Sequence, residues 1–399
     1  MSQASKKKRP RVTDPNAAEA TFGLALSGGG FRASLFAVGS LIRIHEQGLF
    51  PRLKRVTAVS GGSITLGVAA MHWEELAAAP PGCRATLDRL LIQPIVSVTS
   101  QRLDVPNVIK GMLWPSVSAA DLLARGYRRH LFGDHTLSQL PKSRRSSTNK
   151  VPEFVFYATN LQTGRSVRLT GSHISDYTIG RYRLNAGHDI PLATAVAASS
   201  AFPPFFAPVV LRGLDASRWR TTKRTVHTDP AFRNTLHLGD GGIYDNLGLE
   251  AHWQSPPDFL LVADSGRPFK PKLHPRSNWA STLMRTIDIM ADQQRSLRTR
   301  VLLDEFQRPT PRYGGTFWSI ATRMDQFEDP ETPDFRALLQ DNAVTAAMAQ
   351  VPTVLRPIPA ETKHQLMNWG YALADTALRR YVFPDSFAGR LPFSGVVMG

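Results

Sequence analysis

The segment around Ser60 combines residue types that could serve nucleophilic catalysis. Ser60 follows a β-prone run and precedes two glycines, within Ala58-Val-Ser-Gly-Gly62. When a strand reverses into a helix around an exposed serine, the residues two positions before and after it nearly touch, so only small side chains fit there. This is the pattern of a nucleophile elbow, G-x-S-x-G, with Ala58 replacing the first glycine. A plain strand-to-helix turn is the alternative interpretation of these residues.

A second segment, Gly28-Gly-Gly-Phe-Arg32, could bind an anion. Glycines between a strand and a helix let consecutive N–H groups point into one concavity, where the helix N-terminus adds about half a positive charge. A dinucleotide site would need an acidic residue at the end of a second strand about 20 residues on, and a P-loop would need Gly-Lys-Ser/Thr after the glycines. Neither is present, so an oxyanion hole is the hypothesis that remains.

A third segment, Asp240-Gly-Gly242, offers a carboxylate at the end of a predicted strand, although such triplets are often only tight turns. A serine nucleophile needs a base, usually a histidine that an acid orients. No histidine is an obvious candidate, because the four considered lie in a strand, near polar loops or in a helix: His237, His173, His188 and His45. A carboxylate that acts directly on the serine is the simplest arrangement left.

The elements around these segments predict an α/β fold with a parallel sheet. Strands are expected at 21–26 and 55–59, each followed by a glycine turn and then by a helix, at 31–48 and 62–77. Strand, turn and helix, repeated with short links, are typical of a parallel sheet covered by helices. Further strands are expected at 153–159, 166–170, 235–238 and 259–263, and further helices at 84–91, 118–131 and 190–201.

The three segments together resemble the motifs of the patatin-like phospholipases. The family pattern is a G-G-G-x-R oxyanion loop, a G-x-S-x-G elbow and a D-G-A or D-G-G acid, and residues 28–32, 59–63 and 240–242 follow it in the same order. Residues 158–164 are similar to the strand-turn before the family's central helix, and residues 197–204 to its Ala/Ser helix that ends in proline. The resemblance covers about residues 21–270.

The resemblance implies a three-layer fold, with a central, mostly parallel sheet flanked by helices, and a Ser–Asp dyad without histidine. Ser60 would attack an ester carbonyl and Asp240 would accept its proton. The backbone N–H groups of four glycines would hold the oxyanion: Gly28, Gly29, Gly30 and Gly61. The supporting residues would be Arg32, Gly62, Gly241 and Gly242. Ser63 lies close by, but it falls inside the start of the helix, so Ser60 is the expected nucleophile.

The expected activity is phospholipase A-type hydrolysis of glycerophospholipid esters, without metal or cofactor. A neutral-lipid lipase, a thioesterase or a transacylase could use the same dyad, because the sequence does not specify a headgroup. An alternative of another class is a non-catalytic protein, whose glycine nest holds phosphate while its basic surface binds an anionic partner.

The chain of 399 residues carries a formal net charge of +16. Basic residues cluster in the N-terminal tail, around 142–150 and between 212 and 224. These clusters lack interleaved aromatic residues apart from Trp219, and no nucleic-acid-binding motif is present. Attraction to an anionic membrane surface, or solubility alone, is therefore favoured over nucleic-acid binding.

The location expected from the sequence is cytoplasmic, with contact to a membrane only from its surface. Cys83 is the single cysteine, which excludes an internal disulfide framework and fits a reducing compartment. The basic N-terminus is not followed by the apolar run of a signal peptide, and no stretch approaches the roughly 18 apolar residues of a membrane span.

Three regions are expected: a disordered basic arm at 1–20, the acyl hydrolase domain at 21–270 and a mainly helical extension at 271–399 packed on the core. The extension should contain a helix at 278–306, a strand at 314–320 and a helix at 362–381. The near-heptad apolar stripe of the first helix predicts core packing: Leu283, Ile287, Met290, Leu297 and Val301. The extension and the apolar loop 105–114 are also candidates for a lid, and the loop for membrane docking.

Overall fold

The computed structural model describes residues 11–103, 118–142, 151–204, 206–329, 331–332 and 334–398. Two predictions therefore lie outside the described residues, the one on the apolar loop 105–114 and the one on nearly all of the basic cluster 142–150. The first ten residues of the expected basic arm also lie outside them.

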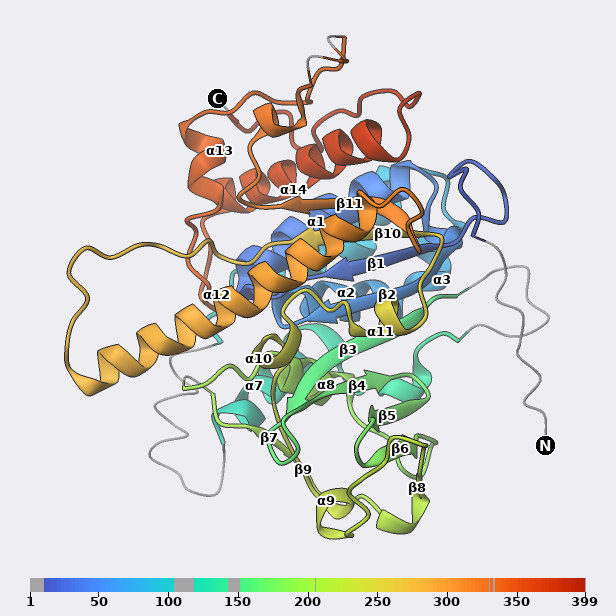
Figure 1. Ribbon diagram of the computed structural model, residues 1–399, viewed down its shortest axis with the longest axis vertical. Helices are drawn as coiled ribbons and strands as arrows, with labels where there is room; N and C mark the ends of the chain where they lie inside the picture. The colour runs from blue at the N-terminus through green and yellow to red at the C-terminus, as the bar shows by residue number, and fades with distance from the viewer. Residues whose placement is uncertain are drawn as a thin grey trace.

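A sheet of 11 strands forms the centre of the described structure (Figure 1). Its parallel part has the order β11-β10-β1-β2-β3. These strands span Gly314–Ser319, Phe259–Asp264, Phe22–Leu26, Leu53–Val59 and Glu153–Asn160. Every residue of β1 and β10 is buried, as expected for parallel strands covered by helices on both faces. The predicted helix-flanked sheet with a parallel centre is confirmed.

Beyond β3 the sheet is antiparallel. β4 (Arg165–Thr170) forms the expected hairpin with β3, and β9 (Leu236–Asp240) pairs with the other edge of the end of β3. The remaining strands are β5 (His173–Asp176), β6 (Gly180–Arg183), β7 (Val209–Leu211) and β8 (Trp219–Arg220). These four strands were not predicted, because two to four residues are too few to show an alternating pattern.

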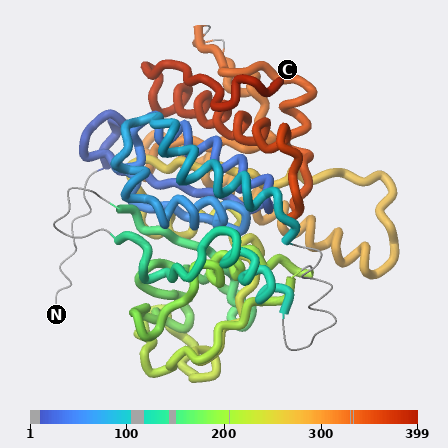
Figure 2. The backbone as a smooth tube through the Cα atoms, turned by 180° about the vertical axis from the view of Figure 1, so that it is seen from behind, coloured from blue at the N-terminus to red at the C-terminus, as the bar shows by residue number. Residues whose placement is uncertain are grey.

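Helices cover both faces of the sheet. On the face turned toward the viewer in Figure 1 lie α12 (Trp279–Phe306), α10 (Gly242–Asp245) and α11 (Glu250–Gln254). On the opposite face, seen from the front in Figure 2, lie α1 (Gly30–Glu46), α2 (Gly61–Met71) and α14 (Ala360–Tyr381). The other α-helices of the described residues are α3 (Trp73–Ala78), α4 (Arg84–Leu87), α5 (Gln93–Val98), α7 (Ala119–Tyr127), α8 (Leu192–Ser199), α9 (Ala231–Asn234) and α13 (Ala343–Met348).

The C-terminal part of the chain is built into this core. β11 adds a parallel strand beside β10, and α14 packs along α1. A Cβ atom at Gly39 of α1 would lie 1.9 Å from the Met367 carbonyl oxygen, and one at Gly370 of α14 would lie 2.1 Å from the Phe36 carbonyl oxygen. The two helix backbones therefore touch where the two glycines meet.

The core packing predicted for the stripe of α12 is wrong. Leu283, Met290, Leu297 and Val301 are each more than half exposed. The buried residues of α12 are Leu302 and Glu305, near its C-terminal end. A heptad-like repeat shows that apolar side chains share one face of a helix, but what covers that face depends on the rest of the fold.

The predicted disorder of residues 1–20 is also wrong for the part that the structure describes. The Val12 N–H donates to the Asp258 carboxylate at 3.0 Å, and Arg52 donates to the carbonyl oxygens of Pro15 and Ala17. The polar composition of this segment hid these backbone contacts, because they depend on partners far along the chain. Within the described ranges, no helix is both long and apolar enough to cross a membrane.

Candidate active site

The sheet brings the ends of the predicted catalytic segments to one edge. β1, β2 and β10 run parallel, so the segments that follow their carboxyl ends leave the sheet on the same side. Val59, the last residue of β2, pairs with Tyr157 of β3, and the next residue of β3, Ala158, pairs with Asp240. Ser60 and Asp240 therefore meet where these strands end. We call this side of the sheet, at the carboxyl ends of its parallel strands, the catalytic edge.

Ser60 has the strained backbone of a nucleophile elbow. Its φ of 49° is the only positive φ of a non-glycine residue in the described part of the chain. The Ser60 N–H donates to the Ser199 hydroxyl at 3.0 Å, and the Ser63 hydroxyl lies 2.8 Å from the same oxygen. Ser63 is fully buried, whereas Ser60 is partly exposed. A substrate can thus reach Ser60 and not Ser63, and Ser199 emerges as a residue that holds the elbow.

The elbow and the glycine loop are in direct backbone contact. A Cβ atom at Gly61 would lie 2.0 Å from the Gly30 carbonyl oxygen, and one at Gly62 would lie 2.6 Å from the Leu26 carbonyl oxygen. The Ser34 hydroxyl donates to the Gly61 carbonyl oxygen at 2.8 Å, which fixes the same contact from the side of α1. Only glycine fits at these two positions of the elbow.

The backbone donors of the glycine loop divide into two groups. The Gly28 N–H donates to the Asn246 carbonyl oxygen at 3.2 Å, and the Phe31 N–H donates to the Val354 carbonyl oxygen at 3.1 Å. The N–H groups of Gly29, Gly30 and Gly61 have no acceptor among the described residues. The expectation that Gly28 donates to an oxyanion is thus corrected, because its N–H is already taken.

Asp240 has the environment of a base that works near neutral pH. Its side chain is only 3% exposed, and burial raises the pKa of Asp240 to about 7. A hydrogen bond from the Gly242 N–H at 2.6 Å and the Ser60 hydroxyl, within hydrogen-bonding reach, both oppose this rise in the pKa. A carboxyl group of this kind can take up and release a proton at physiological pH.

Three histidines of the chain make hydrogen bonds away from Ser60 and Asp240. His45 bonds the Leu76 carbonyl oxygen, and His173 bonds the hydroxyl of Thr170. His252 is buried between Thr57 and Leu24, and burial lowers the pKa of His252 to about 3. Within the described ranges, no histidine hydrogen-bonds Ser60 or Asp240.

The sequence of residues 24–253 matches the family model described as Patatin-like phospholipase. The chain belongs to the patatin-like phospholipase family. The match contains the glycine loop, the elbow and the acid segment, and it ends before β10.

Several solved structures resemble this patatin-like chain at low sequence identity. Human GIVD cytosolic phospholipase A2 is 13% identical, with 91% of this chain and 61% of that chain covered and a TM-score of 0.46. VipD from Legionella pneumophila is also 13% identical, with 90% and 66% covered and a TM-score of 0.34. ExoU of Pseudomonas aeruginosa, solved with SpcU, is 16% identical, with 73% and 53% covered and a TM-score of 0.22. The chain thus spans about three fifths of the length of the human protein's structure. No curated protein sequence matches the chain.

Two supports of the patatin-like site come from beyond the family match. Arg32 is buried and donates to the Ser265 carbonyl oxygen at 2.7 and 3.1 Å and to the Val351 carbonyl oxygen at 2.6 Å. Val354 accepts from Phe31, as described above, so the segment 351–354 holds the glycine loop at two points. Arg32 was predicted as a supporting residue, but its partners could not be predicted because they lie far along the chain.

Asn246 is a further residue of the site that the sequence analysis missed. Its side-chain oxygen would lie 2.5 Å from a Cβ atom at Gly28 and 2.7 Å from one at Gly242. The Asn246 side chain therefore fills the space between the glycine loop and the acid segment. Only the single turn of α10 brings it back beside Ser60, and that turn gave no signal in the sequence.

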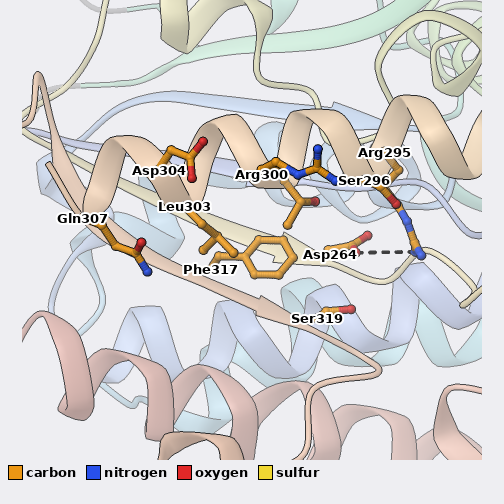
Figure 3. A pocket seen from close by; sticks show the side chains of 10 residues that line it. Asp264, Arg295, Ser296, Arg300, Leu303, Asp304, Gln307, Phe317 and Ser319 are labelled. Atoms are coloured by element: carbon orange, nitrogen blue, oxygen red, sulfur yellow. Dashed lines mark ion pairs between the residues drawn. The ribbon is translucent and has the colours of Figure 1, made fainter.

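A hollow of about 540 Å³ lies beside the catalytic edge, between α12 and the ends of β10 and β11 (Figure 3). Arg295 of α12 reaches across it to Asp264 at 3.6 Å. Neither Ser60 nor Asp240 lines this hollow. No group of three His, Cys, Asp or Glu side chains in the described part of the chain is placed to hold a metal ion.

Proposed function

We propose that the chain is a lipid acyl hydrolase that cleaves ester bonds of glycerophospholipids with a Ser60–Asp240 dyad. The observation that carries the proposal is the pairing of a strained, partly exposed Ser60 with a buried Asp240 whose pKa is raised to about 7. Membership in the patatin-like phospholipase family supports the same chemistry. The proposed catalytic domain spans residues 21–270, and the extension 271–399 supports its glycine loop.

In the proposed first step, the Ser60 hydroxyl oxygen attacks the ester carbonyl carbon while Asp240 takes the hydroxyl proton. The electron pair of the C=O bond moves to the carbonyl oxygen, where the N–H groups of Gly29, Gly30 and Gly61 stabilise the negative charge. When this intermediate collapses, the C–O bond to the alcohol breaks. The leaving lysophospholipid takes the proton from Asp240, and the acyl group stays on Ser60.

In the second step, Asp240 takes a proton from water, and the hydroxide attacks the acyl-serine. The collapse of this intermediate releases the fatty acid, and Ser60 regains its proton from Asp240. The proposed setting is the surface of an anionic membrane, which a net charge of +16 favours. The proposed location is cytoplasmic, because a single cysteine suits a reducing compartment.

A fluorophosphonate probe tests the dyad, because it reacts only with an activated serine. The wild-type protein should be labelled at Ser60 and should cleave p-nitrophenyl esters. Ser60→Ala should lose both properties, and the buried neighbour variant Ser63→Ala should keep them. Unlabelled wild-type protein, or wild-type ester hydrolysis by Ser60→Ala, would contradict the proposal. Product analysis on phospholipid, triacylglycerol and acyl-CoA separates a phospholipase from a lipase or a thioesterase.

A further inference from the structure

The first half of α12 and the segment that leads to it extend away from the body of the molecule (Figures 1 and 2). Large apolar side chains on this part are exposed to an unusual degree: Leu273 at 88%, Trp279 at 80%, Met290 at 66% and Leu283 at 52%. Trp279, Leu283 and Met290 follow one another along α12 at spacings of four and seven residues, which place them on one side of the helix. Exposed apolar patches of this kind mark surfaces that bind a partner or a membrane. We call residues 266–290 the α12 arm.

The charges of the α12 arm favour an anionic partner. It carries five arginines and lysines and one acidic residue: Arg267, Lys270, Lys272, Arg276 and Arg285, against Asp288. The resulting net charge is +4, and four of the five basic residues are exposed. A second copy of this chain would bring the same positive charge to the contact, so self-association through the arm is opposed by repulsion.

Basic residues of the arm surround a hollow that would suit a lipid headgroup. Lys272, Arg276 and Arg285 line a hollow of about 530 Å³ between the incoming segment and the first turns of α12. The Arg285 guanidinium stacks on the ring of Phe269, with 4.0 Å between its central carbon and the ring centroid. This stacking ties the segment to the helix and holds the cations around the hollow.

We propose that the α12 arm docks the protein on an anionic lipid surface. A helix with Trp, Leu and Met on one side and basic residues beside it is typical of segments that lie in the headgroup region of a bilayer. Phosphate groups would neutralise the basic residues while Trp279, Leu283 and Met290 enter the outer acyl region. The proposal rests on the proposed function, since it names the surface by which the same catalytic edge reaches its lipid.

The arm is joined directly to the catalytic edge. It leaves the sheet at Gly266, two residues after the end of β10, and β10 ends beside β1 and its glycine loop. Arg298, farther along α12, lies 3.6 Å from Asp245 of α10, the short helix that begins two residues after Asp240. Docking through the arm therefore turns the catalytic edge toward the same membrane.

Vesicle co-sedimentation of the full-length Ser60→Ala protein tests the proposal without turnover. The protein should bind vesicles of phosphatidylcholine with phosphatidylserine, more weakly at higher salt, and bind phosphatidylcholine vesicles poorly. Replacing Lys270, Lys272, Arg276 and Arg285 by Gln should weaken binding on the order of a hundredfold or more. Replacing Trp279, Leu283 and Met290 by Ala should weaken it at least about tenfold.

A matched control removes the same number of positive charges elsewhere. Replacing four residues of the basic region 212–224 by Gln should leave vesicle binding within about twofold of the parent: Arg212, Arg220, Lys223 and Arg224. Equal loss in the arm and control variants, or parental binding by the arm variants, overturns the proposal. Dimers in sedimentation velocity that the Trp279 variant dissociates would overturn it too, because a second copy would then cover the arm.

A soluble ester separates this proposal from the proposed function. In a Ser60 background, the arm variants should hydrolyse a short-chain p-nitrophenyl ester at the wild-type rate, while their hydrolysis of anionic vesicles falls with their binding. If the wild-type protein hydrolyses no ester but Ser60→Ala binds vesicles through the arm, the dyad fails and the docking surface stands. If esters are hydrolysed and the arm variants bind vesicles normally, the docking surface fails alone.

Discussion

The residues around Ser60 and those of the α12 arm differ in what surrounds them. At the elbow, a single added carbon at Gly61 would lie 2.0 Å from a backbone oxygen, so a change there must move the main chain. On the arm, Leu283 and Met290 are more than half exposed, so a change there meets solvent. The contrast separates a part of the molecule that is fixed by its own fold from a part that the fold leaves exposed to solvent.

The largest expected effect is at Asp240, where activity and stability should change in opposite directions. Asp240→Asn removes the base and should lower ester hydrolysis about 10⁴-fold. The native pKa of about 7 is above the unfolded value, so the wild-type carboxyl group is protonated in the native state near pH 5. Between the ordinary value of 3.8 and about 7, the unfolded state gives up this proton while the native state keeps it, so the native state loses stability across this range and stays level above it.

Denaturant unfolding of the Asp240→Asn protein near pH 5 and near pH 8 checks this expectation. The variant should exceed the wild-type free energy of unfolding by a small margin near pH 5 and by a larger margin near pH 8, because it carries no charge to bury. A variant that unfolds more easily than wild type at both pH values would mean that the carboxyl group stabilises the fold rather than serving as a base.

The pH dependence of wild-type activity is the next largest effect expected at the catalytic edge. kcat/KM on a soluble ester should fall about tenfold per pH unit below pH 7 and level off above it, because only the deprotonated Asp240 can accept the Ser60 proton. The arm variant Trp279→Ala should show the same profile on this substrate. A flat profile between about pH 5 and pH 8 would rule out Asp240 as the base.

A glycine pair gives the next contrast. Gly61→Ala should lower the free energy of unfolding by about 1–3 kcal/mol and reduce activity, because the new methyl group overlaps the Gly30 carbonyl group. Gly395→Ala is the matched control, since nothing lies within 4 Å of a Cβ atom there. Thermal unfolding and ester hydrolysis of both variants measure the difference, and equal behaviour would mean that the elbow is not closely packed.

The smallest effect is expected on the arm. Leu283→Ala should change the free energy of unfolding by less than about 0.5 kcal/mol, because the side chain is already more than half exposed. Leu373→Ala, at a fully buried position of α14, should cost about 2–5 kcal/mol. Denaturant unfolding compares the two leucines, and a large cost at Leu283 would show that the arm packs on the body in solution.

These two leucines also show that the sequence predicted where the helices lie but not which of them is buried. The helices that became α12 and α14 were both expected, with bounds close to those observed, because hydrophobic periodicity is a local property. Which helix would be buried was not predictable in this way. α14 has Gly370 where its backbone meets α1, whereas the buried residues of α12, Leu302 and Glu305, lie near its C-terminal end.

The residues at the catalytic edge also include some that the sequence predicted and some that it could not predict. The local patterns around Ser60, Gly30 and Asp240 predicted that these residues would end strands and begin turns, and the parallel sheet then brings them together. The roles of Asn246 and Ser199 in packing the site were missed, because each depends on a contact with a distant segment. The loss of Gly28 as a donor has the same cause, since its acceptor is the Asn246 carbonyl group.

The contacts of Val351 and Val354 with the glycine loop make the proposed site depend on a segment far from it in the sequence. The carbonyl groups that anchor Arg32 and Phe31 lie more than 300 residues after the loop. A chain released or cut before residue 351 carries Ser60 and Asp240 with the glycine loop unsupported. We therefore expect proteolytic removal of the residues from 351 onward to abolish ester hydrolysis, although the proposed nucleophile and base both remain in the chain.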